Sequence, residues 1–390
     1  MVPLQYNVRS LFVRRINSFA TLFGVALVAL VFSGAQMLAA GVERTVAGRG
    51  RDDVAIIVRR GSESELTSTV EDSAVAVALA RPEVAPSSAG ANPVAAAEVV
   101  VVAALPKVGA KGFSNVTLRG VESRSASLRP ALELVEGRWP APNSEEAMVG
   151  RRIRGRFQGL TIGDSFELRK NRPVRVVGVF ADDGDASESE VWMDREVLRA
   201  AFGRQGSVSS LRVQLTSRDT FDSLQTALEG DKRLGVSVLR ERTFLERQSQ
   251  GLGVFIRVLG TVVAVLFSIG TMIGAMITMH GSVAHRRREI GTLRALGFSS
   301  ASILTGFLAE AVVLTSAGGL VGSVAALGLS RFEVSMINYA SWSELVFTFA
   351  PTPAILLSSI AFAMFMGLVG GLLPAVRAAR IPPLEALRAR

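Results

Sequence analysis

The stretch His285-Arg-Arg-Arg-Glu-Ile-Gly-Thr-Leu-Arg-Ala-Leu-Gly-Phe298 lies between two long apolar segments and has the pattern of a short helix. Its apolar residues recur every three positions along one predicted helix side: Ile290, Leu293 and Leu296. Its charge comes mainly from Arg286, Arg287, Arg288 and Arg294. Gly297 predicts the end of this helix, and Ser299 or Ser300 can cap the next one. Two interpretations stay open: a helix held at a membrane surface by lipid headgroups, or a docking helix for a partner.

The net charge of the chain is concentrated beside its apolar segments. The 390 residues are 49% hydrophobic with a formal charge of +9, and the mean hydropathy of +0.36 is too apolar for an ordinary soluble protein. Eleven basic and two acidic residues in 1–15, 285–298 and 377–390 account for the whole net charge. This is the positive-inside pattern of membrane proteins, and we expect no nucleic-acid partner. The absence of cysteine excludes disulfides and cysteine-based zinc sites.

Long uncharged runs predict four transmembrane helices, because about 20 apolar residues cross a bilayer core. The predicted spans are 16–42, 254–280, 301–329 and 351–376. The intervening pieces are an amphipathic helix at 1–15, a docking loop at 281–300, a short outer connection at 330–350 and a tail at 377–390. An alternative for the first run is a signal peptide, but the run is longer than the apolar region of such peptides. Four spans place both termini and all three basic pieces on one side.

Residues 43–250 form the one large region outside the membrane, and they are long enough to build a core. Strand and helix patterns interleave without a repeat, which predicts an α+β domain between the first and second spans. Predicted strands include 54–58, 99–102, 116–120, 132–135, 191–193, 211–215 and a hairpin across 165–180. Predicted helices are 65–80, 149–157, 195–202 and 221–228, and 182–190 is predicted to be a solvated acidic loop. From Arg242 the pattern is helical, so we expect the second span to continue outward as a stalk.

The sequence carries no pattern for covalent catalysis. It contains no phosphate-binding loop, and its two histidines, His280 and His285, stand in no metal-binding motif. We therefore expect no enzyme activity, metal site or cofactor in this chain. Glu310 interrupts the third span, and a carboxylate there is expected to face a partner group. Its alternative place is the membrane interface. Gly318 and Gly322 are spaced for close helix packing.

Several segments together resemble the FtsX/MacB-like permeases, also called type VII ABC transporters. The resemblance is carried by Arg288-Glu-Ile-Gly-Thr-Leu-Arg-Ala-Leu-Gly297, by Glu310, and by Pro374-Ala-Val-Arg-Ala-Ala-Arg-Ile-Pro-Pro-Leu-Glu-Ala-Leu-Arg388. Asn7 to Leu11 is similar to the family's approach to the first span, and parts of 146–179 are similar to its extracytoplasmic module. The four-span layout resembles that of LolC/LolE-like members.

The resemblance implies a permease dimer, formed with a second copy or a paralogue, that binds two ATPase subunits. ATP and Mg²⁺ would then be bound by the ATPase, and its closure would move the outer domain, a process called mechanotransmission. The implied ATPase-docking residues are Arg287, Arg288, Glu289, Ile290, Leu293, Arg294, Leu296 and Gly297. The implied intramembrane contact residues are Glu310, Gly318 and Gly322. The implied cytoplasmic tail residues are Arg377, Arg380, Pro382, Leu384 and Glu385.

The resemblance also implies a place in the cell, the bacterial inner membrane with both termini cytoplasmic. Since only about 15 residues precede the first span, we expect a stand-alone permease whose ATPase is a separate chain. The expected cargo is hydrophobic: a drug, a peptide or a lipoprotein, with a periplasmic adaptor and an outer-membrane channel as further candidate partners. The alternatives are an FtsX-like regulator of a cell-wall hydrolase and a membrane-anchored sensor.

Overall fold

The computed structural model describes residues 15–48, 50–87, 92–338 and 341–382. These residues form two compact units. One is helical and comprises the chain up to Ala40, Val254–Phe332 and the chain from Phe349. The other comprises Gly41–Gly253 and Glu333–Thr348. The amphipathic helix expected at 1–15 lies outside the described residues, except for Arg15, which opens the first helix.

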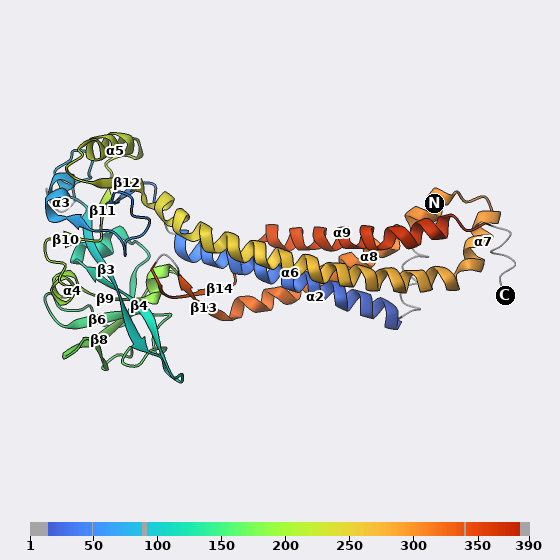
Figure 1. The fold of residues 1–390 in the computed structure, drawn as a ribbon, viewed down its shortest axis with the longest axis horizontal. Coiled ribbons are helices and arrows are strands. Elements are labelled where there is room, and N and C mark those ends of the chain that lie inside the picture. The colour runs from blue at the N-terminus through green and yellow to red at the C-terminus, as the bar shows by residue number, and fades with distance from the viewer. Residues whose placement is uncertain (1–14, 49, 88–91, 339–340, 383–390) are drawn as a thin grey trace. The chain divides into compact units, whose positions relative to one another are not determined.

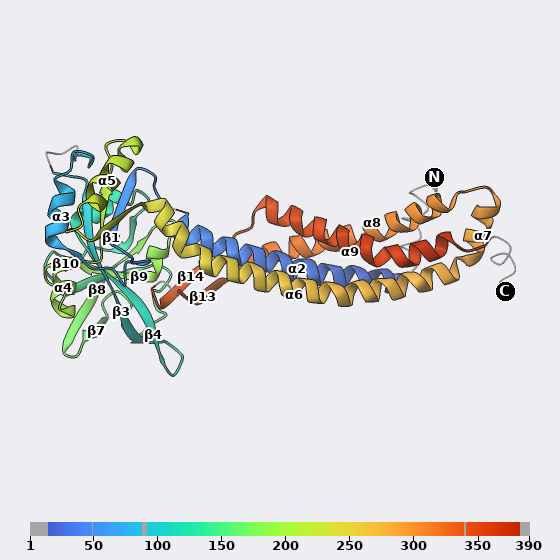
Figure 2. The same ribbon diagram turned by 45° about the horizontal axis from the view of Figure 1, so that its top comes forward.

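Four long helices run alongside one another in the helical unit (Figures 1 and 2). They are α2 (Arg15–Ala47), α6 (Glu241–His285), α8 (Ser300–Leu327) and α9 (Pro353–Ala379). All four are long and apolar enough to cross a membrane, in agreement with the four predicted spans. Their starts follow local chemistry: the Ser299 side chain accepts the Ser302 N–H before α8, and Thr352 accepts the Ile355 N–H before α9.

The second span continues well beyond a bilayer core. Helix α6 has 45 residues without a break, which corresponds to about 68 Å against about 30 Å of hydrocarbon. Its charged residues precede the uncharged run that begins at Val258. The predicted stalk is therefore confirmed as the first part of the same helix.

The domain between the first two spans is built on one sheet of ten strands (Figure 1). Its strand order is β12 (Val236–Arg240), β1 (Val54–Arg59), β11 (Ser210–Gln214), β3 (Ala95–Pro106), β4 (Phe113–Val121), β9 (Glu190–Asp194), β6 (Glu146–Gly150), β8 (Arg172–Ala181) and β5 (Glu133–Gly137), with β7 (Ser165–Arg169) paired to β8. Only the β4–β9 and β6–β8 pairs are parallel among these. The long strand β3 pairs with β11 through its first residues and with β4 through the rest.

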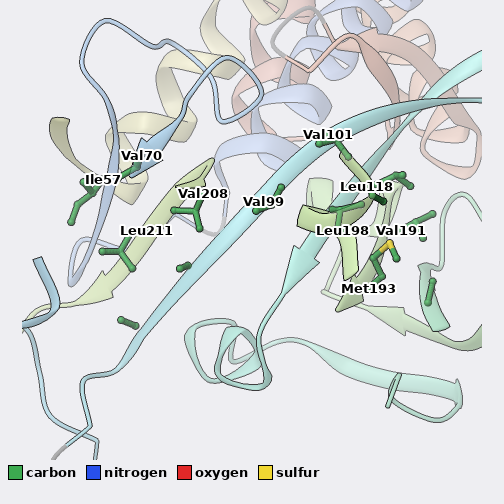
Figure 3. Close-up of a cluster of buried hydrophobic side chains, with 14 of the residues drawn as sticks. Ile57, Val70, Val99, Val101, Leu118, Val191, Met193, Leu198, Val208 and Leu211 are labelled. Carbon is green, nitrogen blue, oxygen red and sulfur yellow. The ribbon is translucent and has the colours of Figure 1, made fainter. Parts of the chain in front are cut away.

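One face of this sheet carries the apolar core. Val99 and Val101 of β3 and Leu118 of β4 point to the same side as Leu211 of β11, and all four are buried (Figure 3). Helices α3 (Asp72–Leu79), α4 (Arg195–Phe202) and α5 (Phe221–Gly230) contribute apolar side chains to the same core. Because side chains alternate along a strand, the residues between these positions face the other side.

Most predicted strands are present, but two predicted helices differ from the structure. The helix expected over 65–80 begins only at Asp72, after the short strand β2 (Val70–Glu71). The helix expected over 149–157 is wrong: β6 ends at Gly150, and turns follow it. In those turns Gly155 and Gly159 adopt left-handed backbone angles, with φ of 69° and 79°. Ile153 and Phe157 of this segment are buried in the core, and Leu160, which follows it, is buried there too.

The connection between α8 and α9 is a β-hairpin that belongs to the domain. Strands β13 (Glu333–Asn338) and β14 (Ser343–Thr348) pair with each other. Glu344 is salt-bridged to Lys107 at 2.6 Å and to Arg156 at 2.9 Å, and the Val346 N–H donates to Ser189. The sequence analysis expected only a short outer connection here, so the hairpin is a feature that it missed.

Candidate functional site

The predicted docking helix is α7 (Arg287–Ala295), which follows α6 directly. It ends in a Schellman motif: the Phe298 N–H donates to the Leu293 carbonyl and the Gly297 N–H to the Arg294 carbonyl, both at 3.1 Å. Gly297 accommodates this turn with φ of 94°. The sequence therefore located the end of the helix correctly.

The apolar residues of this segment have different roles. Ile290 is 2% exposed and packs in a cluster with Val283 of α6, Ile303 of α8 and Ala378 of α9. Leu293 is half-buried, whereas Leu296, at the end of the helix, is 72% exposed. Ile290 thus anchors α7 to the ends of three long helices and is not available to a partner.

The exposed surface of α7 is mainly charged. Arg287, Arg288 and Glu289 are exposed, and Leu296 adds one apolar side chain at the helix end. Arg294 is half-buried, and its Nη1 donates to Ser300 Oγ at 2.6 Å. We call Arg287, Arg288, Glu289 and Leu296 the docking surface, after the role that the sequence predicts for this segment.

Glu310 of α8 has a basic partner within the chain. Arg286 Nη1 donates to Glu310 Oε2 at 3.1 Å, and both side chains are largely buried. Arg286 stands at the junction of α6 and α7, and it also lies 3.5 Å from Glu289. The Glu310 carboxylate therefore fixes the junction that precedes the docking surface.

The two glycines proposed for helix contact lie against α2. A Cβ atom on Gly318 would come within 2.9 Å of the Leu22 carbonyl oxygen, and one on Gly322 within 2.2 Å of the Ala26 oxygen. Any larger residue would push these helices apart. Both glycines thus make an intrachain contact in this structure.

The described part of the tail lies beside α6. Arg377 Nη1 is 2.8 Å from His280 Nε2, and Arg380 and Pro382 follow at the end of α9. Together with Arg287 they line one cavity of about 420 Å³. The remaining two tail residues of the prediction, Leu384 and Glu385, lie outside the described residues.

A second concentration of charge, which the sequence did not predict, lies on the sheet face opposite the apolar core. Arg212 is paired with Ala96, two residues before Glu98, and Arg119 is paired with Val100, two residues after it. The alternation of strands therefore brings Arg212, Glu98 and Arg119 to one face. Glu190 joins them, because its register partner on β4 is Thr117, two residues before Arg119.

These residues form a dense ion network. Arg119 binds Glu190 at 2.7 Å, Glu98 at 2.9 Å and Glu65 at 3.1 Å. Glu98 has no solvent exposure and also binds Arg129 at 2.7 Å, as well as Arg212. Three arginines thus surround one buried carboxylate, which satisfies the requirement that buried charge be paired.

The network borders a cavity of about 310 Å³, which we call the charged cavity. Its charged lining residues are Arg51, Glu65, Arg119, Arg129, Asp182, Asp185, Glu190, Arg212 and Glu241. Glu241 is the first residue of α6 and accepts from Arg212 Nε at 3.1 Å and from the Arg51 N–H at 3.2 Å. The start of α6 is therefore tied directly to the sheet.

The carboxyl groups of this cavity have different pKa values for clear reasons. Arg119 and Arg212 outweigh the effect of burial and lower the pKa of Glu65 to about 2. The same balance, with Arg129 added, holds the pKa of Glu98 far below its usual range. Burial raises the pKa of Asp185 to about 7, helped by the nearby Asp182 and Glu190 carboxylates and opposed by the Ser187 N–H and Arg129.

The predicted solvated acidic loop at 182–190 is instead folded and partly buried. Glu188 is buried and accepts from the backbone N–H groups of Asp182 and Gly184, and it lies 3.3 Å from Arg152. Residues Ala186–Ser189 form a short 3₁₀ helix. Glu188 is thus bound by Arg152 and by backbone N–H groups of its own loop, and not by water as the sequence prediction implied.

Among the described residues, no group of three or more His, Cys, Asp or Glu side chains is arranged to hold a metal ion.

Two family models match this chain. Residues 16–230 match the MacB-like periplasmic core domain, and residues 261–383 match the FtsX-like permease C-terminal region. Among solved structures, the periplasmic region of MacB from Actinobacillus actinomycetemcomitans is similar at 14% identity and a TM-score of 0.38. That similarity covers 52% of this chain and 92% of the other.

Curated relatives are ABC transporter permeases by name. The uncharacterised permease YvrN of Bacillus subtilis is 26% identical over 99% of this chain and 98% of its own length. The uncharacterised permease YknZ of the same organism is 29% identical over 56% of this chain, and the match spans 54% of YknZ. The macrolide export ATP-binding/permease protein MacB of Nitrosomonas europaea is 31% identical over 55% of this chain, a match that spans 33% of that protein.

Proposed function

Because the chain belongs to the FtsX/MacB-like family of ABC transporter permeases, we propose that it couples ATP hydrolysis in separate ATPase subunits to movement of its periplasmic domain. The observation that carries this proposal is the docking surface. Ile290 anchors α7 to the bundle while Arg288 and Leu296 remain exposed. A force applied to α7 by a bound ATPase would therefore act on the long helices as well.

The route of transmission in this proposal is α6. The helix is continuous from Glu241 to His285, so a displacement at its α7 end is carried along its length. At the other end, Glu241 is held by Arg212 of β11 and by the Arg51 backbone. We assign the Arg212–Glu241 pair as the joint through which α6 moves the sheet.

The proposed assembly contains two ATPase subunits, which bind ATP and Mg²⁺, and two permease chains, identical or paralogous. It lies in the bacterial inner membrane with both termini cytoplasmic, as the basic flanks of the spans favour. Relatives are named for export of macrolides and of pyoverdine. By analogy, the proposed cargo is a hydrophobic drug, peptide or lipoprotein, with an adaptor and an outer-membrane channel as further partners.

The test is affinity purification of the full chain from native membranes, with measurement of co-purifying chains and ATP hydrolysis. The wild-type chain is expected to retain an ATPase in a one-to-one ratio. The Arg288→Glu, Leu296→Asp variant should lose it, because the changes place acidic groups on the docking surface.

Val135→Asp is the control for the Leu296→Asp change, because it also introduces one acidic group at an exposed apolar residue, here in the domain. It should retain the ATPase. The proposal fails if the docking-surface variant still binds the ATPase and supports hydrolysis at the wild-type level. A regulator of a cell-wall hydrolase would pass this test too, and would be recognised by a hydrolase among the co-purifying chains.

A further inference from the structure

The cavity between the ends of α6 and α9, which we call the basic pocket, has a one-sided charge. Its lining includes Arg287, Arg377 and Arg380, with His280, Pro374 and Ile381, and no Asp or Glu. Across the part of the chain that the structure describes, no carboxylate lies within ion-pair distance of these three arginines. Such a concentration of guanidinium groups favours an anionic ligand.

One of the arginines is held in place by a neutral histidine. His280 Nδ1 lies 2.9 Å from the Met276 carbonyl oxygen, which can only accept, so Nδ1 carries the proton. His280 Nε2 is then the acceptor for Arg377 Nη1 at 2.8 Å. The imidazole thus orients the Arg377 guanidinium without supplying a negative charge. The other N–H groups of the guanidinium remain for an external acceptor.

Apolar side chains lead to the pocket along both helices. Ile277 precedes His280 by three residues and is 67% exposed, and Leu373 precedes Arg377 by four residues and is 56% exposed. Residues at these spacings lie on the same side of a helix. In a helix that crosses a membrane, such exposed apolar surface faces acyl chains. The basic pocket therefore lies where lipid-facing surface gives way to charge.

We propose that the basic pocket binds the phosphate group of an anionic phospholipid, with its acyl chains along Ile277 and Leu373. Basic pockets at the ends of membrane helices have the chemistry that recognises acidic headgroups. A soluble acidic protein segment would suit the arginines but not the adjoining apolar surface. This inference requires only that the helices cross a membrane, so it does not depend on the ATPase coupling proposed above.

A simpler explanation is that these arginines only satisfy the positive-inside rule or the helix C-terminal dipole. Both effects need positive charge but no particular geometry. Replacement of arginine by lysine separates the two explanations, because lysine keeps the charge and loses the planar fork that binds phosphate.

The experiment is native mass spectrometry of the full chain in detergent, titrated with phosphatidylglycerol or phosphatidylcholine. We expect phosphatidylglycerol to bind about tenfold more tightly than phosphatidylcholine. The Arg377→Lys, Arg380→Lys variant should lose most of that preference, since two bidentate contacts are removed. The control Arg331→Lys, which changes an exposed arginine outside the pocket, should keep that preference. Thermal midpoints without added lipid would show that each variant is folded.

Equal binding of the two lipids, or an unchanged preference in the double lysine variant, would overturn the proposal. Competition by glycerol phosphate at the same concentration as the lipid would also overturn it, in favour of a soluble anion. A photo-crosslinking residue at position 381, activated in native membranes, provides an independent measurement. Phospholipid adducts support the lipid site, whereas crosslinks to another protein or to residues 383–390 contradict it.

Discussion

In the charged cavity of the domain, Arg119, Arg129 and Arg212 each have a carboxylate within ion-pair distance. In the basic pocket, Arg377 and Arg380 have no carboxylate within that distance among the described residues. In the first set Arg119 and Arg212 are buried on strands β4 and β11 and Arg129 is partly buried, so their charges must be balanced inside the fold. The second set is exposed at helix ends, where the fold does not require a partner. The difference indicates that the domain uses arginine to hold itself together and the helix ends use it to bind something else.

The largest expected effect comes from removing the central carboxylate of the domain network. Glu98→Gln should lower the free energy of unfolding by about 3–5 kcal/mol, because the buried Arg119 and Arg212 and the partly buried Arg129 would share too little negative charge. Unfolding can be followed by Trp192 fluorescence in the full chain with Trp139 and Trp342 replaced by Phe. Trp192 is suitable because its Nε1 donates to Glu190 within the same network.

Two controls define the comparison. Glu146→Gln removes the partner of exposed Arg138 and should cost much less than Glu98→Gln, because water screens an exposed pair. Arg380→Gln in the basic pocket should leave the stability nearly unchanged, since no carboxylate among the described residues depends on it. A similar loss in all three variants would remove the distinction between the two arginine sets.

An intermediate effect is expected for the ion pair between Arg286 and Glu310. Glu310→Gln and Arg286→Gln should each lower stability by about 2 kcal/mol, because each removes the ion pair between two largely buried side chains. The double variant should cost no more than either single change. The thermal midpoints of the wild type, the two single variants and the double variant in detergent form a double-mutant cycle. Additive losses in this cycle would show that the two side chains are not coupled.

The smallest effect is a pH dependence centred on Asp185. Its raised pKa favours the neutral form in the fold, so its contribution to stability is full below about pH 4 and is lost as the pH rises through about 7. Asp185→Asn should therefore stabilise the chain by about 1 kcal/mol at pH 8 and change little at pH 4. The Asn side chain can still accept the Ser187 N–H.

The control for this prediction is Asp164→Asn, which neutralises an exposed carboxylate. This variant should leave the thermal midpoint of unfolding unchanged at both pH 4 and pH 8. Glu65 acts in the opposite direction: its pKa of about 2 gives a contribution that is lost as the pH falls from about 4.5. A loss of stability at low pH that persists in Asp185→Asn is therefore expected.

The sequence predicted the four long helices and the short helix α7 because their signals are local. An uncharged run such as 258–284 needs no knowledge of its neighbours, and Gly297 ends α7 through contacts within a few residues. The family resemblance and the four-span layout with an α+β domain are confirmed. The boundaries given to the domain and the roles of individual docking residues stay predictions.

The charged cavity could not be predicted, because it depends on strand register. Glu98 is separated from Arg119 by 21 residues and from Arg212 by 114. Only the order β11, β3, β4 and β9 makes them neighbours. One signal was present: Glu98 directly precedes the apolar run Val99–Val102, where an unpaired charge would be costly.

The β13–β14 hairpin has a consequence for the order in which the protein is made. Residues 41–253 leave the ribosome before α8, but residues 344–346, which provide partners for Ser189, Lys107 and Arg156, come later. The domain can thus complete its contacts only after the third span has been synthesised and its far end has reached the domain's side of the membrane. The hairpin links the final folding of the domain to the insertion of that span, so a chain arrested in translocation would carry an unfinished domain.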